Sequence, residues 1–177
     1  SMKQKLPGLL VLLGGLTCAS HALEIGDRVG LLELLTLDGR GLTMTNYAER
    51  RATVVVFLSA RSGIAQPEVS AINELNSRLR LRGVLFVGVF PNVEETGAEV
   101  RRFVQSAGLL FPSYRDPEQK AARRCGVQVT PAACLLDAAG TLVYRGAVGG
   151  TNGPGLNDAL TAFLKDQPVP AGHRPAQ

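Results

Sequence analysis

Two uninterrupted apolar runs, separated by an amphipathic segment, constrain the fold of this chain most strongly. Val54 to Leu58 and Val84 to Phe90 contain no charged side chain, which predicts strands buried on both faces of a sheet. Between them, Pro67 suits a first helical position, and apolar residues at helical spacing from Val69 to Leu79 predict a helix that stops at Gly83. Strand, helix and strand in this order predict a parallel crossover and an α/β fold.

Shorter segments complete the predicted order of elements. Leu31 to Leu37 and Leu42 to Met44 predict an N-terminal hairpin across an Asp-Gly turn. Asn92, followed three residues later by Glu95, is typical of a capping box and predicts a helix that ends at Gly108. The remaining predicted elements are a short strand over 111–114, a helix capped by Asp116 and closed at Gly126, paired strands over 132–136 and 142–145, and a terminal helix over 157–165.

The first 22 residues have the features of a secretory signal peptide. Lys3 and Lys5 give a positive start, Leu9 to Leu16 form a short apolar core, and small residues precede Leu23. This pattern predicts cleavage after residue 22 and export to the periplasm or the medium. The apolar core is shorter than the roughly 20 residues of a spanning helix, so we expect no stable membrane span in the mature chain. A lipoprotein anchored at Cys18 is the alternative.

The length and the charge of the chain further limit the number of domains and the kinds of partner that we expect. About 155 residues follow the signal peptide, enough for one domain with a sizeable core. Without Lys3 and Lys5, 17 Lys and Arg stand against 15 Asp and Glu, a balance that predicts no nucleic-acid partner. Residues 167–177 are rich in proline and lack apolar periodicity, which predicts a loose tail after a domain over 23–166.

Two motifs connect this order of elements to a known family. Residues 59–65 read SARSGIA and follow the first buried run, and residues 126–137 read GVQVTPAACLLD. Together they resemble the thioredoxin superfamily, in its redoxin branch of alkyl hydroperoxide reductase and thiol-specific antioxidant relatives. The resemblance covers residues 23–166. It implies a thioredoxin-like α/β fold, with a central mixed sheet flanked by helices and an N-terminal β-hairpin extension.

The resemblance also assigns positions to the reactive site. In such proteins the attacking cysteine lies at the start of the helix after the first core strand, the position of Ser62, and a second cysteine often lies at the position of Ala65. This chain has neither, and Gly63 replaces the intervening proline. A serine does not gain the lowered pKa that activates a thiolate there. Arg61 and the helix start are still expected to attract an anion or a polar ligand group.

A second implication of the resemblance concerns Thr130 and Pro131. In the family this proline is cis and faces the active site, and the residue before it offers its backbone N–H and C=O to an extended substrate. Such recognition adds a strand to the protein through main-chain hydrogen bonds. Thr130 is therefore the expected binding contact that remains when the cysteines are absent.

Cys125 and Cys134 are the two thiols of the predicted mature chain. Export would permit a disulfide between them. The resemblance places Cys125 at a helix end and Cys134 in mid-strand, whereas a disulfide needs Cα atoms within roughly 4.4–6.8 Å. We therefore expect free thiols, with a buried Cys134 that packs as a small apolar residue.

Other catalytic chemistry has little support in the sequence. Ser62 as a hydrolytic nucleophile would need an adjacent general base, and the one histidine after the signal peptide, His173, lies in the predicted tail. Two cysteines and one histidine without close spacing do not form an ordinary zinc site. We expect no metal and no cofactor.

Two classes of function follow. In the first, the chain is a redox-inactive module that binds an extended peptide or a protein partner in the cell envelope. In the second, it is a thiol-disulfide oxidoreductase or peroxiredoxin-like antioxidant protein. That activity would use Cys125 or Cys134, or Ser62 would be an engineered replacement for a cysteine. The changes at Gly63 and Ala65 favour natural loss of the cysteines over an engineered replacement, and we prefer the first class.

Overall fold

A seven-stranded mixed sheet runs through the part of the chain that this computed structural model describes, residues 23–150 and 153–172. The strand order is β2-β1-β5-β4-β3-β6-β7. The strands are β1 (Leu32–Leu35), β2 (Gly41–Met44), β3 (Ala52–Phe57), β4 (Val84–Phe90), β5 (Ser113–Arg115), β6 (Ala132–Asp137) and β7 (Leu142–Gly146).

The two apolar runs form the interior of this sheet. β3 and β4 pair in parallel, with Val55 beside Val87, and α1 (Gln66–Leu79) makes the crossover between them. β6 pairs antiparallel with β3, and β7 with β6. On the other side β5 is parallel to β4, and the antiparallel β1–β2 hairpin forms the outer edge. The thioredoxin-like arrangement expected from the sequence is therefore confirmed.

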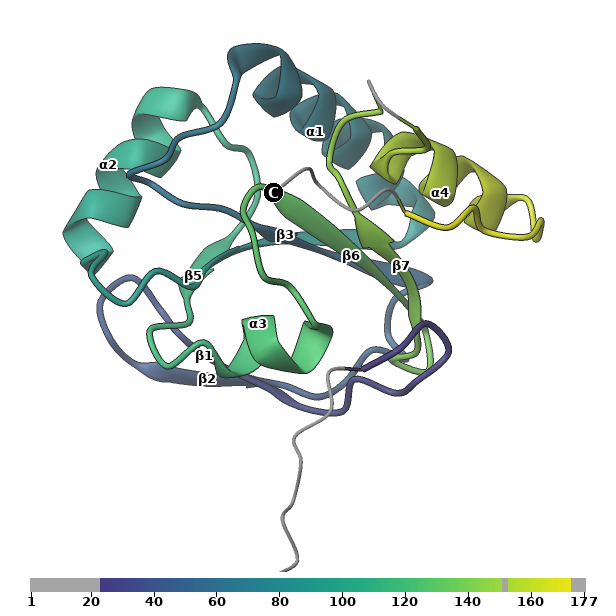
Figure 1. The fold of residues 1–177 in the computed structure, drawn as a ribbon, viewed down its shortest axis with the longest axis horizontal. Helices are drawn as coiled ribbons and strands as arrows, with labels where there is room; N and C mark the ends of the chain where they lie inside the picture. The colour runs from purple at the N-terminus through teal and green to yellow at the C-terminus, as the bar shows by residue number, and fades with distance from the viewer. Residues whose placement is uncertain (1–22, 151–152, 173–177) are drawn as a thin grey trace, which may run out of the picture.

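Helices cover both faces of the sheet, which explains why β3 lacks polar alternation. Val54 and Val56 pack in one core with α1, α2 (Gly97–Ala107) and α4 (Leu156–Leu164). Val55 and Phe57 pack in a second core with α3 (Lys120–Cys125) and the hairpin. Figure 1 shows α3 on the opposite side of the sheet from α1 and α4. Neighbouring side chains of a strand point to opposite faces, so both sets are buried.

The start of α2 differs from its prediction. The capping box involves Thr96 and Glu99: the Thr96 hydroxyl accepts from the Glu99 N–H at 3.2 Å, and the Glu99 carboxylate accepts from the Thr96 N–H at 2.7 Å. The Asn92 and Glu95 pair predicted for this role is therefore wrong. Thr96 has the extended backbone that an N-cap requires, whereas Glu95 is buried.

The start of α3 also differs from its prediction. The N-cap is Gln119, in a left-handed conformation with φ of 55°, and Lys120 is the first helical residue. Asp116, predicted as the cap, lies in the preceding loop, and its Oδ2 accepts from the Ala122 N–H at 2.9 Å. The carboxyl group thus still satisfies a backbone donor of the first turn. Gly126 ends the helix as predicted, with φ of 67°.

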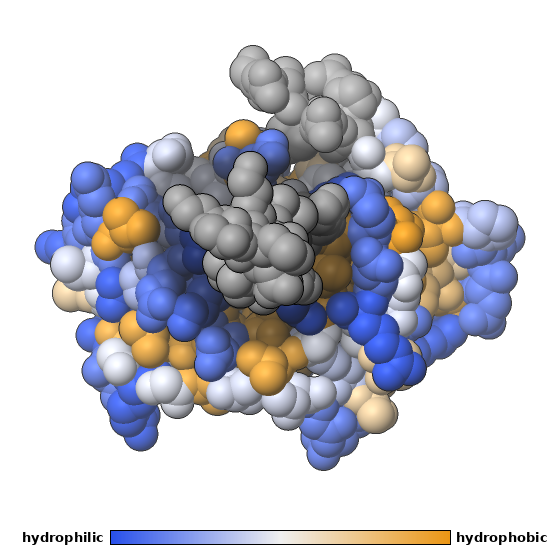
Figure 2. All heavy atoms as spheres, turned by 60° about the horizontal axis from the view of Figure 1, so that its bottom comes forward, coloured by the Kyte–Doolittle hydropathy of each residue, from blue (hydrophilic) through white to orange (hydrophobic). Residues whose placement is uncertain are grey.

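The segment predicted as a loose tail lies partly on the fold. Val169 packs against the core that contains α1 and α4, and a Cβ added at Gly172 would lie 2.1 Å from the Arg145 carbonyl oxygen. The signal peptide predicted over residues 1–22 lies outside the described residues. Within the described ranges, no helix is long and apolar enough to cross a membrane. On the face seen in Figure 2, outside the grey atoms, hydrophobic residues form small patches separated by hydrophilic ones, as is normal for a protein surface.

Candidate functional site

A groove of about 470 Å³ opens at the carboxyl ends of the parallel strands β3 and β4. This edge of an α/β sheet is where ligands commonly bind, because the loops that follow parallel strands converge there. Three loops and one helix contribute to the groove. The lining residues are Leu58, Ser59, Ser62, Pro91, Asn92, Val93, Gln119, Ala122, Arg123 and residues 127–130.

Ser62 lies in a tight turn that follows β3. Its N–H donates to the Ser59 hydroxyl at 3.0 Å, and the Gly63 N–H donates to the Ser59 carbonyl at 3.0 Å. Gly63 has φ of 72°, a left-handed conformation that glycine adopts without a steric penalty. The helix α1 begins only at Gln66, with Ala65 as its N-cap. The expectation that Ser62 occupies the helix N-terminus is therefore wrong, since the turn occupies the intervening residues.

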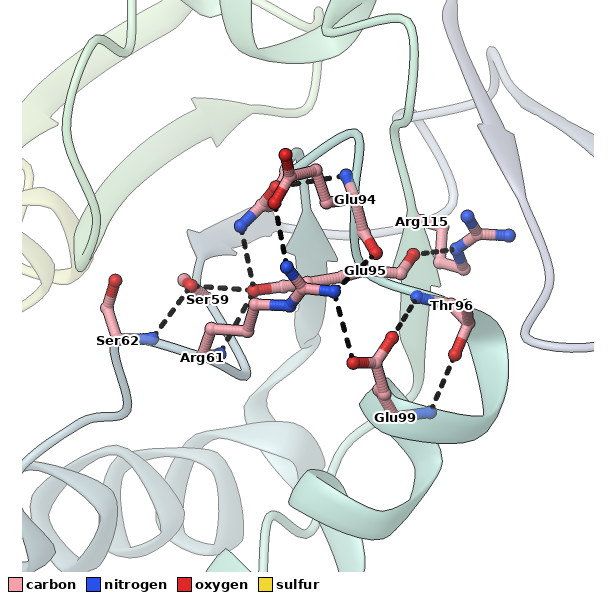
Figure 3. A network of polar contacts seen from close by, with 9 residues as sticks. Ser59, Arg61, Ser62, Glu94, Glu95, Thr96, Glu99 and Arg115 are labelled. Carbon is pink, nitrogen blue, oxygen red and sulfur yellow. Dashed lines mark hydrogen bonds and ion pairs between the residues drawn. The ribbon is translucent and has the colours of Figure 1, made fainter.

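Arg61 points away from the position where an anion was expected. Its guanidinium forms ion pairs with Glu94 at 2.7 Å and with Glu99 at 3.2 Å, and it also donates to the Glu94 carbonyl at 2.9 Å. These contacts tie the turn to the start of α2, as Figure 3 shows. Two carboxylates already balance this one positive charge, so Arg61 offers little attraction to an anion beside Ser62.

Thr130 and Ser62 line the same groove. The Thr130–Pro131 peptide bond is cis, and both residues are half-buried. In the part of the chain that the structure describes, neither the N–H nor the C=O of Thr130 makes a hydrogen bond. Such unpaired main-chain groups are what an added strand would use. Ala65, by contrast, is not part of the groove lining.

The cysteines lie in the core rather than in the groove. Cys125 ends α3, Cys134 lies in the middle of β6, and both are free and buried in the core that contains α3. The hydrogen bond to the Cys125 side chain, together with burial, raises the pKa of the Cys134 thiol well above its ordinary value. The expectation of free thiols is met. A raised pKa disfavours the thiolate, which is the reactive form.

Glu95 is the site residue that the sequence did not reveal. Its side chain is buried beneath the turn, and Oε1 accepts from the Ser59 hydroxyl at 2.7 Å and from the Arg61 N–H at 3.1 Å (Figure 3). A signal was present, because two adjacent acidic residues lie in the loop after a buried strand, at the binding edge of the sheet. The capping-box pattern concealed it by assigning Glu95 to a helix start.

No group of His, Cys, Asp and Glu side chains that could hold a metal ion occurs among residues 23–150 and 153–172. The groove is instead lined by hydroxyls, amides and aliphatic side chains, with Arg123 as its charged residue. Such a lining can take main-chain and small apolar groups of a ligand.

The fold and the groove define a thioredoxin-like protein, with a mixed sheet, helices on both faces and a cis peptide bond beside the carboxyl ends of the parallel strands. The Redoxin family model matches residues 22–161. The chain therefore belongs to the Redoxin family.

The chain is also similar to individual proteins, in sequence or in fold. The thiol-disulfide oxidoreductase ResA of Bacillus thuringiensis (strain Al Hakam) is 24% identical over 131 residues, which cover 74% of each chain. The solved hypothetical protein SMc02350 of Sinorhizobium meliloti 1021 has a TM-score of 0.70 at 26% identity, covering 85% of this chain and 89% of that one. A secreted disulfide oxidoreductase of Mycobacterium tuberculosis has a TM-score of 0.56 at 18% identity, covering 76% and 95%.

Proposed function

We propose that this protein is an exported, redox-inactive member of its family that binds an extended peptide or a protein partner in the cell envelope. One observation carries the proposal: Thr130 offers unpaired main-chain groups in the same groove as Ser62. The family resemblance assigns the position of Ser62 to the attacking cysteine. Ser62 and Ala65 cannot form a thiolate or a disulfide. The groove therefore retains a means of binding without a means of exchange.

Export has separate support. Residues 1–22 match the pattern of a secretory signal, with a basic start and a short apolar core. A solved relative is described as secreted. In this proposal the domain over residues 23–166 acts outside the cytoplasm, where unfolded or extended segments of other proteins are available as partners.

A binding experiment tests the proposed function. The probe is a fluorescein-labelled, alkylated insulin B chain, an extended peptide without free thiols, and the readout is fluorescence anisotropy. Val93, 59% exposed on the groove, is changed to Asp; Leu81, 87% exposed on the short 3-10 turn after α1, is changed to Asp as the matched control. We expect Val93→Asp to weaken binding about threefold to tenfold, on the order of 1 kcal/mol of lost apolar contact, and Leu81→Asp to leave it unchanged. Equal effects of both changes, or no binding by the wild type, would contradict the proposal.

The second candidate function is thiol–disulfide exchange. Two observations favour it: the chain retains Cys125 and Cys134, and the relative ResA is named a thiol-disulfide oxidoreductase. The test is reduction of insulin disulfides and of peroxide by the unmodified protein. We expect rates at background. Turnover that Cys125→Ala or Cys134→Ala abolishes would establish the second function instead, and a cysteine codon at position 62 in the genome would favour it.

A further inference from the structure

Glu95 is a buried acidic side chain, without an ion-pair partner among the described residues, directly beneath the turn that carries Ser62. The residue is 1% exposed, and no ion pair involves it in the described ranges. Three donors converge on Oε1: the Ser59 hydroxyl at 2.7 Å, the Arg61 N–H at 3.1 Å and the Asn92 side-chain amide at 3.3 Å. Three donors on one oxygen match a carboxylate. Oε2 is buried without a hydrogen-bond partner in the described chain.

The direction of the hydrogen bonds connects this carboxyl group to Ser62. The Ser59 hydroxyl gives its single proton to Glu95 and accepts the N–H of Ser62 at 3.0 Å. A hydroxyl has one proton to donate, so the acceptor at Glu95 determines how the Ser59 oxygen faces Ser62. The hydrogen bonds from Ser62 to Ser59 and from Ser59 to Glu95 therefore run in one direction, with Glu95 as the final acceptor.

The backbone of Glu95 is held as well. Its N–H donates to the Asn92 carbonyl at 3.2 Å, and its carbonyl accepts from the Arg115 guanidinium at 3.0 Å. The next residue, Thr96, is the N-cap of α2. Glu95 can leave its position only if the loop after β4 and the start of α2 move with it, which makes it a firm support for the turn after β3.

The positively charged side chains near Glu95 do not form an ion pair with its carboxyl group in the described ranges. The guanidinium of Arg61 is paired with Glu94 and Glu99. Arg115 donates to the main-chain carbonyl of Glu95 and not to its side chain, and Arg123 donates to the Glu118 carbonyl. Among the charges without an ion-pair partner in the described residues, the negative charge of Glu95 is therefore the one connected to Ser62 through the fewest hydrogen bonds.

We infer that Glu95 is the positioning and specificity-determining residue of the groove: it holds the turn of residues 59–63 in place and sets a fixed negative charge beneath Ser62. This inference deepens the proposed function and rests on it for its biological meaning. The groove floor at Ser62 disfavours anionic ligand groups, because a like charge lies behind it. It favours neutral or cationic groups, such as hydrogen-bond donors and basic side chains of an extended peptide.

The test places a reporter thiol at the site and uses no peptide, so its outcome is independent of whether the proposed binding occurs. The parent protein carries Ser62→Cys, and the rate of its alkylation by iodoacetamide is measured from pH 5 to pH 10, with the unsubstituted chain giving the background from the buried thiols. Adding Glu95→Gln removes the charge but keeps an acceptor oxygen. We expect the alkylation rate at pH 7 to rise about threefold to tenfold, since the thiolate no longer forms beside a carboxylate. The matched control is Glu74→Gln, an exposed carboxylate on α1 with no ion pair to the turn in the described residues, which we expect to change the rate less than twofold.

Hydrogen exchange at the Ser62 amide tests the positioning role. In the wild-type background, Glu95→Ala removes the acceptor and is expected to speed this exchange at least tenfold, whereas Glu95→Gln keeps protection near the wild-type value. Should Glu95→Ala fail to fold, Glu95→Asp replaces it, because the side chain shorter by one methylene withdraws the acceptor from the Ser59 hydroxyl and leaves the charge in place. An alkylation profile that Glu95→Gln does not move, or that Glu74→Gln moves equally, overturns the charge assignment. Unchanged exchange at Ser62 in Glu95→Ala or in Glu95→Asp overturns the positioning role.

Discussion

Asp116 shows how one buried acid influences the stability of this fold. Its side chain is almost fully buried, and Oδ2 accepts from the Ala122 N–H. Burial raises the pKa of Asp116 above the ordinary 3.8, although backbone N–H groups of α3 oppose the shift. A carboxyl group with a raised folded-state pKa binds its proton more tightly when folded. Its contribution to stability is therefore present at low pH and is lost as the pH rises through the folded-state pKa.

Asp116→Asn should remove this loss, because the amide oxygen can still accept from the Ala122 N–H without a buried charge. We expect the variant to melt a few degrees above the wild type at pH 7, on the order of 1 kcal/mol, and the difference to vanish near pH 3.5. Thermal melts across this pH range measure it. Asp38→Asn is the control, since the hydrogen bond from Thr36 lowers the pKa of exposed Asp38. The contribution of Asp38 to stability is lost as the pH falls. Asp38→Asn should therefore melt no higher than the wild type at pH 7.

At the scale of elements, the capping box at Thr96 determines where α2 begins and therefore where Glu95 lies. The Thr96 hydroxyl satisfies the Glu99 N–H, and the Glu99 carboxylate satisfies the Thr96 N–H while it also pairs with Arg61. One carboxylate thus joins the helix start to the turn that carries Ser62. The cap connects the secondary structure to the candidate site.

Thr96→Ala is expected to lower the free energy of unfolding by about 1 kcal/mol, within the range of 0.5–2 kcal/mol seen for lost N-caps. Denaturant unfolding followed by circular dichroism measures this change. Ser77→Ala, at an exposed position within α1, is the matched control and should be neutral or slightly stabilising, because alanine has the higher helix propensity. If Ser77→Ala destabilises as much as Thr96→Ala, the hydroxyl of Thr96 does not act as a cap.

At the scale of the whole molecule, the N-terminal hairpin is packed directly against α2. A Cβ added at Gly97 would lie 1.9 Å from the Leu37 carbonyl oxygen, in the turn between β1 and β2. Backbone therefore contacts backbone at this point, and only glycine leaves enough room. The contact joins the outer edge of the sheet to the helix that supports the groove.

Gly97→Ala should consequently destabilise the protein by roughly 2 kcal/mol or more, as overpacking against a rigid neighbour does. Gly41→Ala is the control, because its Cβ would meet nothing within 4 Å, and it should change the free energy of unfolding by less than about 0.5 kcal/mol. Equilibrium unfolding of both variants makes the comparison. Equal stabilities would mean that the hairpin moves away from α2 without cost.

The cysteine pair reports on the integrity of the whole molecule, because both thiols are exposed only when the core between α3 and the sheet opens. Cys125 and Cys134 are 0% exposed. In native protein, alkylation of either thiol should therefore be at least a hundredfold slower than in guanidinium-unfolded protein, as mass spectrometry after timed quenching would reveal. Rapid native alkylation of either residue would contradict this burial and would favour the oxidoreductase function.

The sequence by itself determined the fold, because the apolar runs and the helical periodicity that specify it are patterns among neighbouring residues. The runs at 54–58 and 84–90 had to be buried on both faces, and helical periodicity from Val69 to Leu79 required a crossover between them. The motif around Thr130 and Pro131 similarly indicated where the groove would form. Backbone propensity and apolar spacing are properties of neighbouring residues, so they can be read without the rest of the chain.

Only the tertiary structure decided which polar side chains point inward. Two acids stand side by side, yet Glu94 pairs with Arg61 at the surface while Glu95 is buried beneath Ser59. Nothing local distinguishes them, because the choice depends on how the loops after β3 and β4 meet at the edge of the sheet. The same holds for Cys125 and Cys134, which become neighbours only when α3 packs on β6. Burial and charge pairing are decided by contacts between distant segments, and those contacts exist only in the folded chain.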